Sequence, residues 1–168
     1  IVGAASIATC TSCQFGKFSS ERGLSSCTSC SPGRYGPATG LTVCTECETG
    51  KYISHSAQLQ CAVCPLGKYA GVTGLSICQD CDAGTFAQSF GSSQCELCPS
   101  GTYSDSSGRS ICSDCNVGKY LEYRGANHTS HCQDCEPGSY SIITGASSCT
   151  LCTSGKYGMV YGAKDSDE

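Results

Sequence analysis

The sequence predicts a small, disulfide-rich fold, an elongated tandem array of short, irregular β-hairpin-like repeats with almost no helix. Three observations lead to this prediction. Cysteine fills 18 of the 168 positions, which is above the roughly 8–10% typical of a disulfide scaffold. Leu, Ile, Val and Phe together reach only about 15%, below the roughly 20% that an ordinary hydrophobic core needs. The third observation is a strict internal repeat.

The cysteines form nine Cys-x-x-Cys pairs at a nearly constant interval. The interval is 17 residues, apart from one of 20 residues. The pairs open at Cys10, Cys27, Cys44, Cys61, Cys78, Cys95, Cys112, Cys132 and Cys149. Such regularity is typical of a tandem array in which each unit stacks on its neighbours. We therefore divide the chain into a lead-in (1–9), nine repeats of about 17 residues (10–162) and an acidic C-terminal end (163–168).

Each repeat carries two further signals besides its cysteines. A glycine follows the second cysteine by three residues in all nine repeats, and an aromatic residue follows this first glycine by two. A second glycine stands ten residues after the second cysteine in eight repeats, and Ala57 replaces it in the third. The repeat aromatics are Phe18, Tyr35, Tyr52, Tyr69, Phe86, Tyr103, Tyr120, Tyr140 and Tyr157.

These residue types favour turns and short extended runs. The glycines suit turns with positive φ, and the aromatic residue favours a strand. No apolar period of 3.6 residues appears, which argues against helix. We expect each aromatic to be a core plug, packed on the cysteine sulfurs or on the next unit. Because one unit buries so little, stacking on neighbours must stabilise it.

The motif resembles a known family. The run from Cys61 to Cys78, CAVCPLGKYAGVTGLSIC, resembles the ephrin-receptor-like cysteine-rich repeats of the GCC2/GCC3 type, and the run from Cys95 to Cys112 resembles them as closely. The Cys-x-x-Gly-x-Tyr opening is distantly similar to tumour-necrosis-factor-receptor modules. The resemblance covers residues 10–165 and implies an extracellular disulfide repeat. Such repeats occur in receptor ectodomains and in mastigoneme-like surface filament proteins.

Periodicity leaves two disulfide patterns open. In the ladder, the second cysteine of each pair joins the first cysteine of the next pair. In the crossed form, alternate repeats carry two bridges, such as Cys10–Cys27 with Cys13–Cys30. The ladder gives every repeat the same bond, and the resemblance to receptor modules implies it as well, so we favour it. It predicts the bonds Cys13–Cys27, Cys30–Cys44, Cys47–Cys61, Cys64–Cys78, Cys81–Cys95, Cys98–Cys112, Cys115–Cys132 and Cys135–Cys149.

The ladder leaves Cys10 and Cys152 without partners. Ser166 occupies the position where the next cysteine would fall. One hypothesis is an intermolecular disulfide between Cys152 of one molecule and Cys10 of the next. The alternatives are that each pairs with a neighbouring domain of a longer polypeptide, or that the crossed form holds.

A second period of 34 residues overlies the first. The residue before the second cysteine is acidic at Glu46 and Asp80 but apolar at Val63 and Leu97. This alternation predicts successive units rotated by about half a turn, with one acidic edge and one apolar edge. The apolar edge would serve lateral contacts, although chance alternation is the competing explanation.

The 20-residue repeat contains the sequence Asn127-His128-Thr129, an N-glycosylation sequon. Its three extra residues predict an exposed bulge, which would make Asn127 an accessible acceptor.

Composition and motifs exclude several chemistries. The formal net charge is −4 and no basic cluster exists, which argues against nucleic acid, and no apolar run is long enough for membrane insertion. Zinc would use Cys-x-x-Cys pairs, but their odd number and the sequon argue against it. Each acidic linker offers too few oxygens for calcium. His55, His128 and His131 lie in variable loops and are expected to be solvated, so we predict no catalytic residue, no metal and no cofactor.

We therefore expect a non-enzymatic, secreted structural protein at the cell surface or outside the cell. It would be a rod-like subunit or segment of a filament, flagellar hair or surface coat. Self-association, lateral or head to tail, is the expected interaction, with other extracellular proteins as further partners. The alternative is a receptor-ectodomain stalk or ligand-binding cysteine-rich module.

Overall fold

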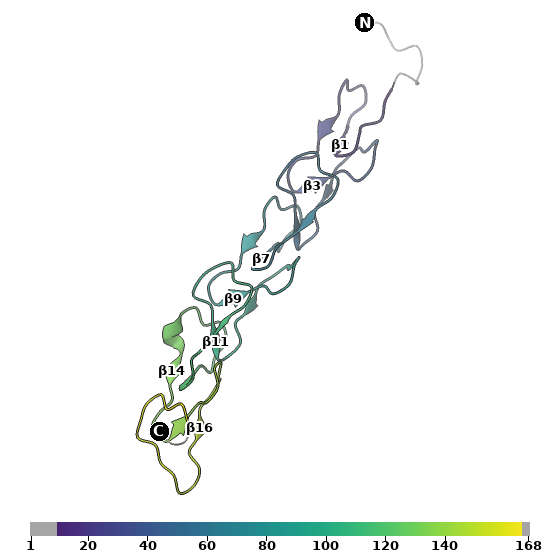
Figure 1. The fold of residues 1–168 in the computed structure, drawn as a ribbon. Helices are drawn as coiled ribbons and strands as arrows, with labels where there is room; N and C mark the ends of the chain where they lie inside the picture. Colours follow the sequence, from purple (N-terminus) through teal and green to yellow (C-terminus); the bar gives the residue numbers. More distant parts are fainter. Residues whose placement is uncertain (1–9, 166–168) are drawn as a thin grey trace. The chain divides into compact units, whose positions relative to one another are not determined.

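A computed structural model describes residues 10–165, so the lead-in 1–9 and residues 166–168 lie outside the described part. Residues 10–165 form short antiparallel hairpins with a single turn of 3₁₀ helix (Figure 1). In each hairpin, the strand that ends at a repeat's aromatic pairs with the two residues between the cysteines of the next repeat. The predicted class, disulfide-rich tandem hairpins with almost no helix, is confirmed.

The described residues contain eight such hairpins. Their strands are β1 (Lys17–Phe18) with β2 (Thr28–Ser29), β3 (Arg34–Tyr35) with β4 (Thr45–Glu46), β5 (Lys51–Tyr52) with β6 (Ala62–Val63), β7 (Lys68–Tyr69) with β8 (Gln79–Asp80), β9 (Thr85–Phe86) with β10 (Glu96–Leu97), β11 (Thr102–Tyr103) with β12 (Ser113–Asp114), β13 (Lys119–Tyr120) with β14 (Gln133–Asp134), and β15 (Ser139–Tyr140) with β16 (Thr150–Leu151).

The chain divides into two compact units. The first holds the residues up to Cys64 together with 70–78, and the second holds 65–69 together with the residues from Gln79 on. Both units are built from the same repeat-to-repeat bonding, so one description of a repeat serves for each unit by itself.

Backbone hydrogen bonds join each repeat to the next. In the first unit, the N–H of the first glycine Gly33 donates to the carbonyl of Ile53, the residue after the next aromatic, at 2.9 Å. In the second unit, Gly101 donates to Leu121 in the same way at 2.8 Å. Parallel bridges such as Tyr103 with Ala126 accompany these bonds. A short sheet edge in one repeat is therefore covered by the repeat that follows it.

A second set of bonds uses the second glycine. The N–H of Gly74 donates to the carbonyl of Cys47 in the preceding repeat, and the N–H of Gly108 donates to Cys81, both at 2.8 Å. The missing glycine of the third repeat leaves this bond intact, because Ala57 adopts a φ of 60° and donates to Cys30 at 2.8 Å.

The core consists of half-cystines and of the residue that follows each aromatic. The second cysteines Cys30, Cys47 and Cys81 are fully buried. Next in burial come the residues after the aromatics, such as Ile53 and Leu121. The expectation that the aromatics are core plugs is wrong, since eight of them are only half-buried and Tyr157 is exposed. Successive side chains of a strand point to opposite faces, so the residue after the ring enters the core while the ring lies in a surface groove.

The long repeat keeps the same register despite its three extra residues. They form η2 (Thr129–His131), and β13 still pairs with β14 on either side of it. Cys115, Leu121, Ala126 and Cys132 make a buried cluster beneath this bulge. The insertion is therefore accommodated at the surface and leaves the stacking unchanged.

Candidate functional site

The repeats are held by eight disulfides, each joining the second cysteine of one pair to the first cysteine of the next. The bonds are Cys13–Cys27, Cys30–Cys44, Cys47–Cys61, Cys64–Cys78, Cys81–Cys95, Cys98–Cys112, Cys115–Cys132 and Cys135–Cys149. This is the ladder arrangement. Cys10 and Cys152 are free thiols, the first exposed and the second partly buried.

The acidic residue before the second cysteine braces its hairpin. Each of three such carboxylates pairs with the basic residue opposite it on the partner strand. The pairs are Arg34–Glu46 at 2.5 Å, Lys68–Asp80 at 2.5 Å and Lys119–Asp134 at 2.6 Å. All six side chains are at least one-third exposed, so each pair contributes about 0.2–1 kcal/mol. Sequence reasoning missed these pairs, although a basic residue 12 positions before each of the first two acids was a readable signal.

The same acids also contact the following repeat. Thr73 donates from its hydroxyl to Glu46 at 2.9 Å, and Thr144 donates to Asp114 at 3.3 Å. Among residues 10–165, no group of three or more His, Cys, Asp or Glu side chains is placed to hold a metal ion. The structural role of these carboxylates is therefore to tie one hairpin to the next.

Lys51 has no acid opposite it, because Val63 occupies that position. Its ammonium instead donates to Glu48 at 2.9 Å. The hydrogen bond and the charge attraction lower the pKa of Glu48 and raise the pKa of Lys51 from their ordinary values. This exchange of partners shows how an apolar residue of the 34-residue alternation changes the local ion pairing.

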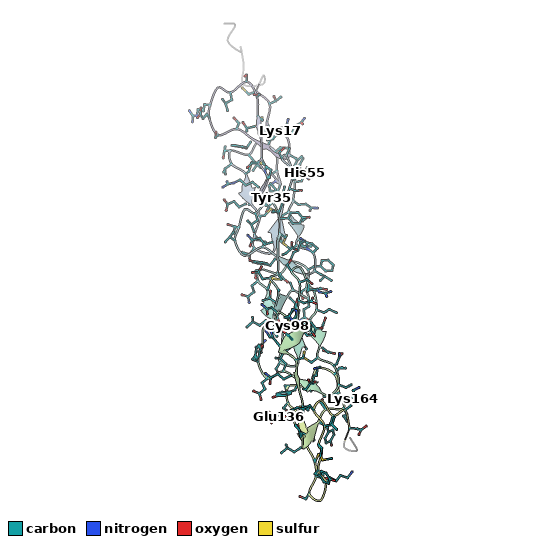
Figure 2. All side chains as sticks on the ribbon, turned by 90° about the vertical axis from the view of Figure 1, so that its left-hand side faces the viewer. Lys17, Tyr35, His55, Cys98, Glu136 and Lys164 are labelled. Carbon is teal, nitrogen blue, oxygen red and sulfur yellow. A yellow bond between two sulfur atoms is a disulfide. The ribbon has the colours of Figure 1, made fainter. Side chains whose placement is uncertain are left out.

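The apolar members of the alternation lie on the surface. Val63 and Leu97 are about half exposed, and Val43, Ile77 and Ile111 are exposed still further. Most side chains point outward from the ribbon (Figure 2). The half-turn between successive repeats and the single apolar edge stay predictions, whereas the exposure of these aliphatic side chains is a finding.

The sequon lies on the surface of the long repeat. Asn127 and Thr129 are exposed, and His128 accepts a hydrogen bond from the backbone N–H of Ser130 at 3.1 Å. His131 departs from the expectation of a solvated side chain. It is partly buried, and its ring lies 5.8 Å from that of Tyr123. The bulge folds back over the buried cluster, which explains the burial of His131.

The last repeat differs from those before it. No strand of the described residues pairs with Lys156 and Tyr157, and Tyr157 is 80% exposed. At the other end, residues near Cys10 line an open hollow. Within residues 10–165 no helix has the length and apolar character that a bilayer span requires.

Comparison with known families gives one match. A family model described as "Tyrosine-protein kinase ephrin type A/B receptor-like" matches residues 33–74, 67–115 and 88–132. These overlapping segments together cover more than half of the chain and coincide with the stacked, disulfide-bonded repeats. No curated protein shows a significant sequence match to the chain.

Proposed function

The chain belongs to the ephrin-receptor-like cysteine-rich repeat family, and on this premise we propose that it is a structural segment of an extracellular filament, hair or surface coat. Repeats of this family are non-catalytic modules, and many disulfides in a short chain are typical of proteins outside the cell. We extend both statements to the whole protein, which would have no enzymatic activity and would act by assembling.

The observation that carries the proposal is that the repeats use their polar groups on one another. Backbone N–H groups, carboxylates and cysteines bond one repeat to the next, as in Gly74 with Cys47 and Thr73 with Glu46. The surface that remains for other molecules includes exposed aliphatic side chains such as Ile77 and Ile111. A surface of this kind supports packing between copies more readily than chemistry on a substrate.

Self-association tests this proposal. The secreted, oxidised protein should show a concentration-dependent rise in sedimentation coefficient. Ile77→Ser with Ile111→Ser should weaken lateral packing, whereas Val72→Ser, at an equally exposed aliphatic side chain outside the alternation, should not. A protein that stays monomeric at every concentration would contradict the proposal.

The family description favours a second candidate. The matching model is named for receptors, so the chain is alternatively a receptor-ectodomain stalk or ligand-binding module. A stalk should remain monomeric under the conditions above and should bind a protein ligand with saturation. The sedimentation experiment therefore separates the two candidates.

We also propose that Asn127 carries an N-linked glycan. The sequon is complete, and its asparagine and threonine are exposed in a bulge that the stacking does not use. A glycan there would keep one face of the long repeat away from lateral contacts.

A further inference from the structure

The C-terminal repeat exposes surface that the earlier repeats bury. Tyr157 is 80% exposed, whereas the other repeat aromatics are half-buried. Leu151 is 75% exposed, whereas Leu97 in the same position is 52% exposed. A β-carbon on Gly155 would meet nothing within 4 Å, whereas a β-carbon on Gly101, the equivalent glycine of an internal repeat, would collide with the carbonyl of Gly145. The last repeat therefore lacks the neighbours that cover an internal one.

The N-terminal repeat carries a hollow of matching kind. It measures about 420 Å³ and its lining includes Thr11, Ser12, Ser26 and Cys27. One repeat later, the equivalent residues line a groove together with Phe18, the aromatic of the preceding repeat. Those residues are Thr28, Ser29, Val43 and Cys44. The hollow is thus the place where the aromatic of a preceding repeat would lie.

We infer that these two ends dock, so that the last repeat of one copy stacks against the first repeat of a second copy in the register of the internal repeats. The inference deepens the proposed function and rests on it, because it specifies the joint of a self-assembling segment. In this register, Cys10 of the second copy takes the position of residue 166, where the next cysteine of the period falls.

The register gives each exposed group a defined partner. Lys156 and Tyr157 would form a hairpin with Thr11 and Ser12 of the second copy, as β1 does with β2. The ring of Tyr157 would enter the hollow beside Cys27 of the second copy. The exposed edge of the last repeat would then acquire the pairing that every earlier aromatic strand has.

Two glycines without close contacts meet in the same register. Gly23 and Gly138 both have positive φ and open space at the β-carbon position. Gly23 of the second copy would lie over Leu151, as Gly125 lies over Leu97, and its N–H would donate to the carbonyl of Cys152. Its own carbonyl would cover Gly138. The first repeat therefore supplies a glycine where the joint needs one.

Docking also brings Cys152 and Cys10 to a bridging position. Each internal repeat bridges the equivalent pair, as in Cys135–Cys149. Oxidised glutathione can serve as the oxidant. The Cys152 thiolate displaces one glutathione thiolate to form a mixed disulfide, and the Cys10 thiolate then displaces the second. One intermolecular bond forms, two thiols are oxidised, and one glutathione disulfide is reduced to two thiols.

The test uses two variants of the full chain, Cys10→Ser and Cys152→Ser, each with one free thiol. Mixed in a glutathione redox buffer, they should form a Cys152–Cys10 linked dimer at least tenfold faster than either forms a homodimer alone. Non-reducing gels measure the rate, and peptide mass spectrometry identifies the bond. Cross-linking in statistical proportions, or no cross-linking, would overturn the inference.

Surface variants in the Cys10→Ser chain separate docking from random collision. Tyr157→Ser should lower the rate of hetero-linkage to that of homodimers. Met159→Ser, at an equally exposed apolar side chain of the same repeat, should leave the rate unchanged. Leu151→Asp should also preserve it, because internal repeats carry Asp at this position beside the second glycine, as with Asp80 and Gly108. Equal losses for Tyr157→Ser and Met159→Ser would contradict the register.

The wild-type chain distinguishes the two levels of failure. Assembly of the oxidised wild type without Cys152–Cys10 linkage would overturn the joint but leave the proposed structural function standing. A monomeric wild type would overturn both.

Discussion

A β-carbon placed on Gly84 would lie 2.5 Å from the carbonyl oxygen of Gly125, which belongs to the repeat after next. The first glycine of this repeat is therefore required twice. Its φ of 85° is in the region that favours glycine, and the backbone of another repeat occupies the space of a side chain. This relationship makes contacts between repeats two apart, as well as between neighbours, part of the fold.

Replacing Gly84 by Ala should destabilise the protein more than replacing Gly138. Both glycines have a φ of 85°, but only Gly84 has a carbonyl against its β-carbon position. The shared backbone cost is about 1–2 kcal/mol, and the collision should add about 1–3 kcal/mol for Gly84→Ala. Thermal and denaturant unfolding of the oxidised proteins would measure the difference, and equal losses would show that the close approach is unimportant.

Replacing Ala57 by Gly should stabilise the third repeat. Ala57 is the one non-glycine residue with positive φ in the described part of the chain. Relief of that backbone strain, about 1–2 kcal/mol, exceeds the entropic cost of about 0.4–1 kcal/mol from a more flexible unfolded chain. The net gain should be about 0.5–1 kcal/mol. Gly74→Ala, at the same repeat position with a φ of 73°, is the reciprocal control and should lose stability.

Removing one internal disulfide should cost far more than removing the free thiols. The bond Cys81–Cys95 links residues 14 positions apart, and a loop of this length contributes about 3 kcal/mol in the chain-entropy description. The double variant Cys81→Ser, Cys95→Ser should lose about that amount in unfolding free energy. The double variant Cys10→Ser, Cys152→Ser, measured as a dilute monomer, should be unchanged. A similar loss in both would argue against the ladder.

The pair formed by Glu48 and Lys51 should give a small dependence of stability on pH. The pKa of Glu48 is lowered in the folded state, so its contribution is present above the ordinary carboxyl pKa and is lost as the pH falls through the lower, folded-state pKa. The pKa of Lys51 is raised, so its contribution is present below the ordinary lysine pKa and is lost as the pH rises through the higher value. Carboxyl NMR titration should find the Glu48 pKa below normal, and Lys51→Met should restore it.

Asn127 should be glycosylated when the protein is secreted by a glycosylating host. Enzymatic deglycosylation converts an occupied asparagine to aspartate, which mass spectrometry detects. Asn127→Gln should remove the mass of the glycan without changing stability, because the side chain is exposed. An unmodified Asn127 in the secreted wild type would refute this prediction.

The periodic part of the fold was readable because it depends on local spacing. The nine cysteine pairs, the two glycines and the aromatic predicted a hairpin repeat, and the structure places each hairpin where the period requires. The aromatic's role was misread for a physical reason. Composition made the ring the largest apolar group of its repeat, but which of two adjacent strand residues faces inward depends on the neighbouring repeat, as Tyr52 and Ile53 illustrate.

The sequence by itself determined the length of the repeat, the class of fold and a choice between two disulfide patterns, because cysteines and glycines restrict the chain locally. Only the tertiary structure decided what the repeats do to each other. It placed Glu46 against both Arg34 and Thr73, and it brought Gly125 over Gly84. These contacts join residues in different repeats, so they depend on how repeats stack in space, which no single period along the chain specifies.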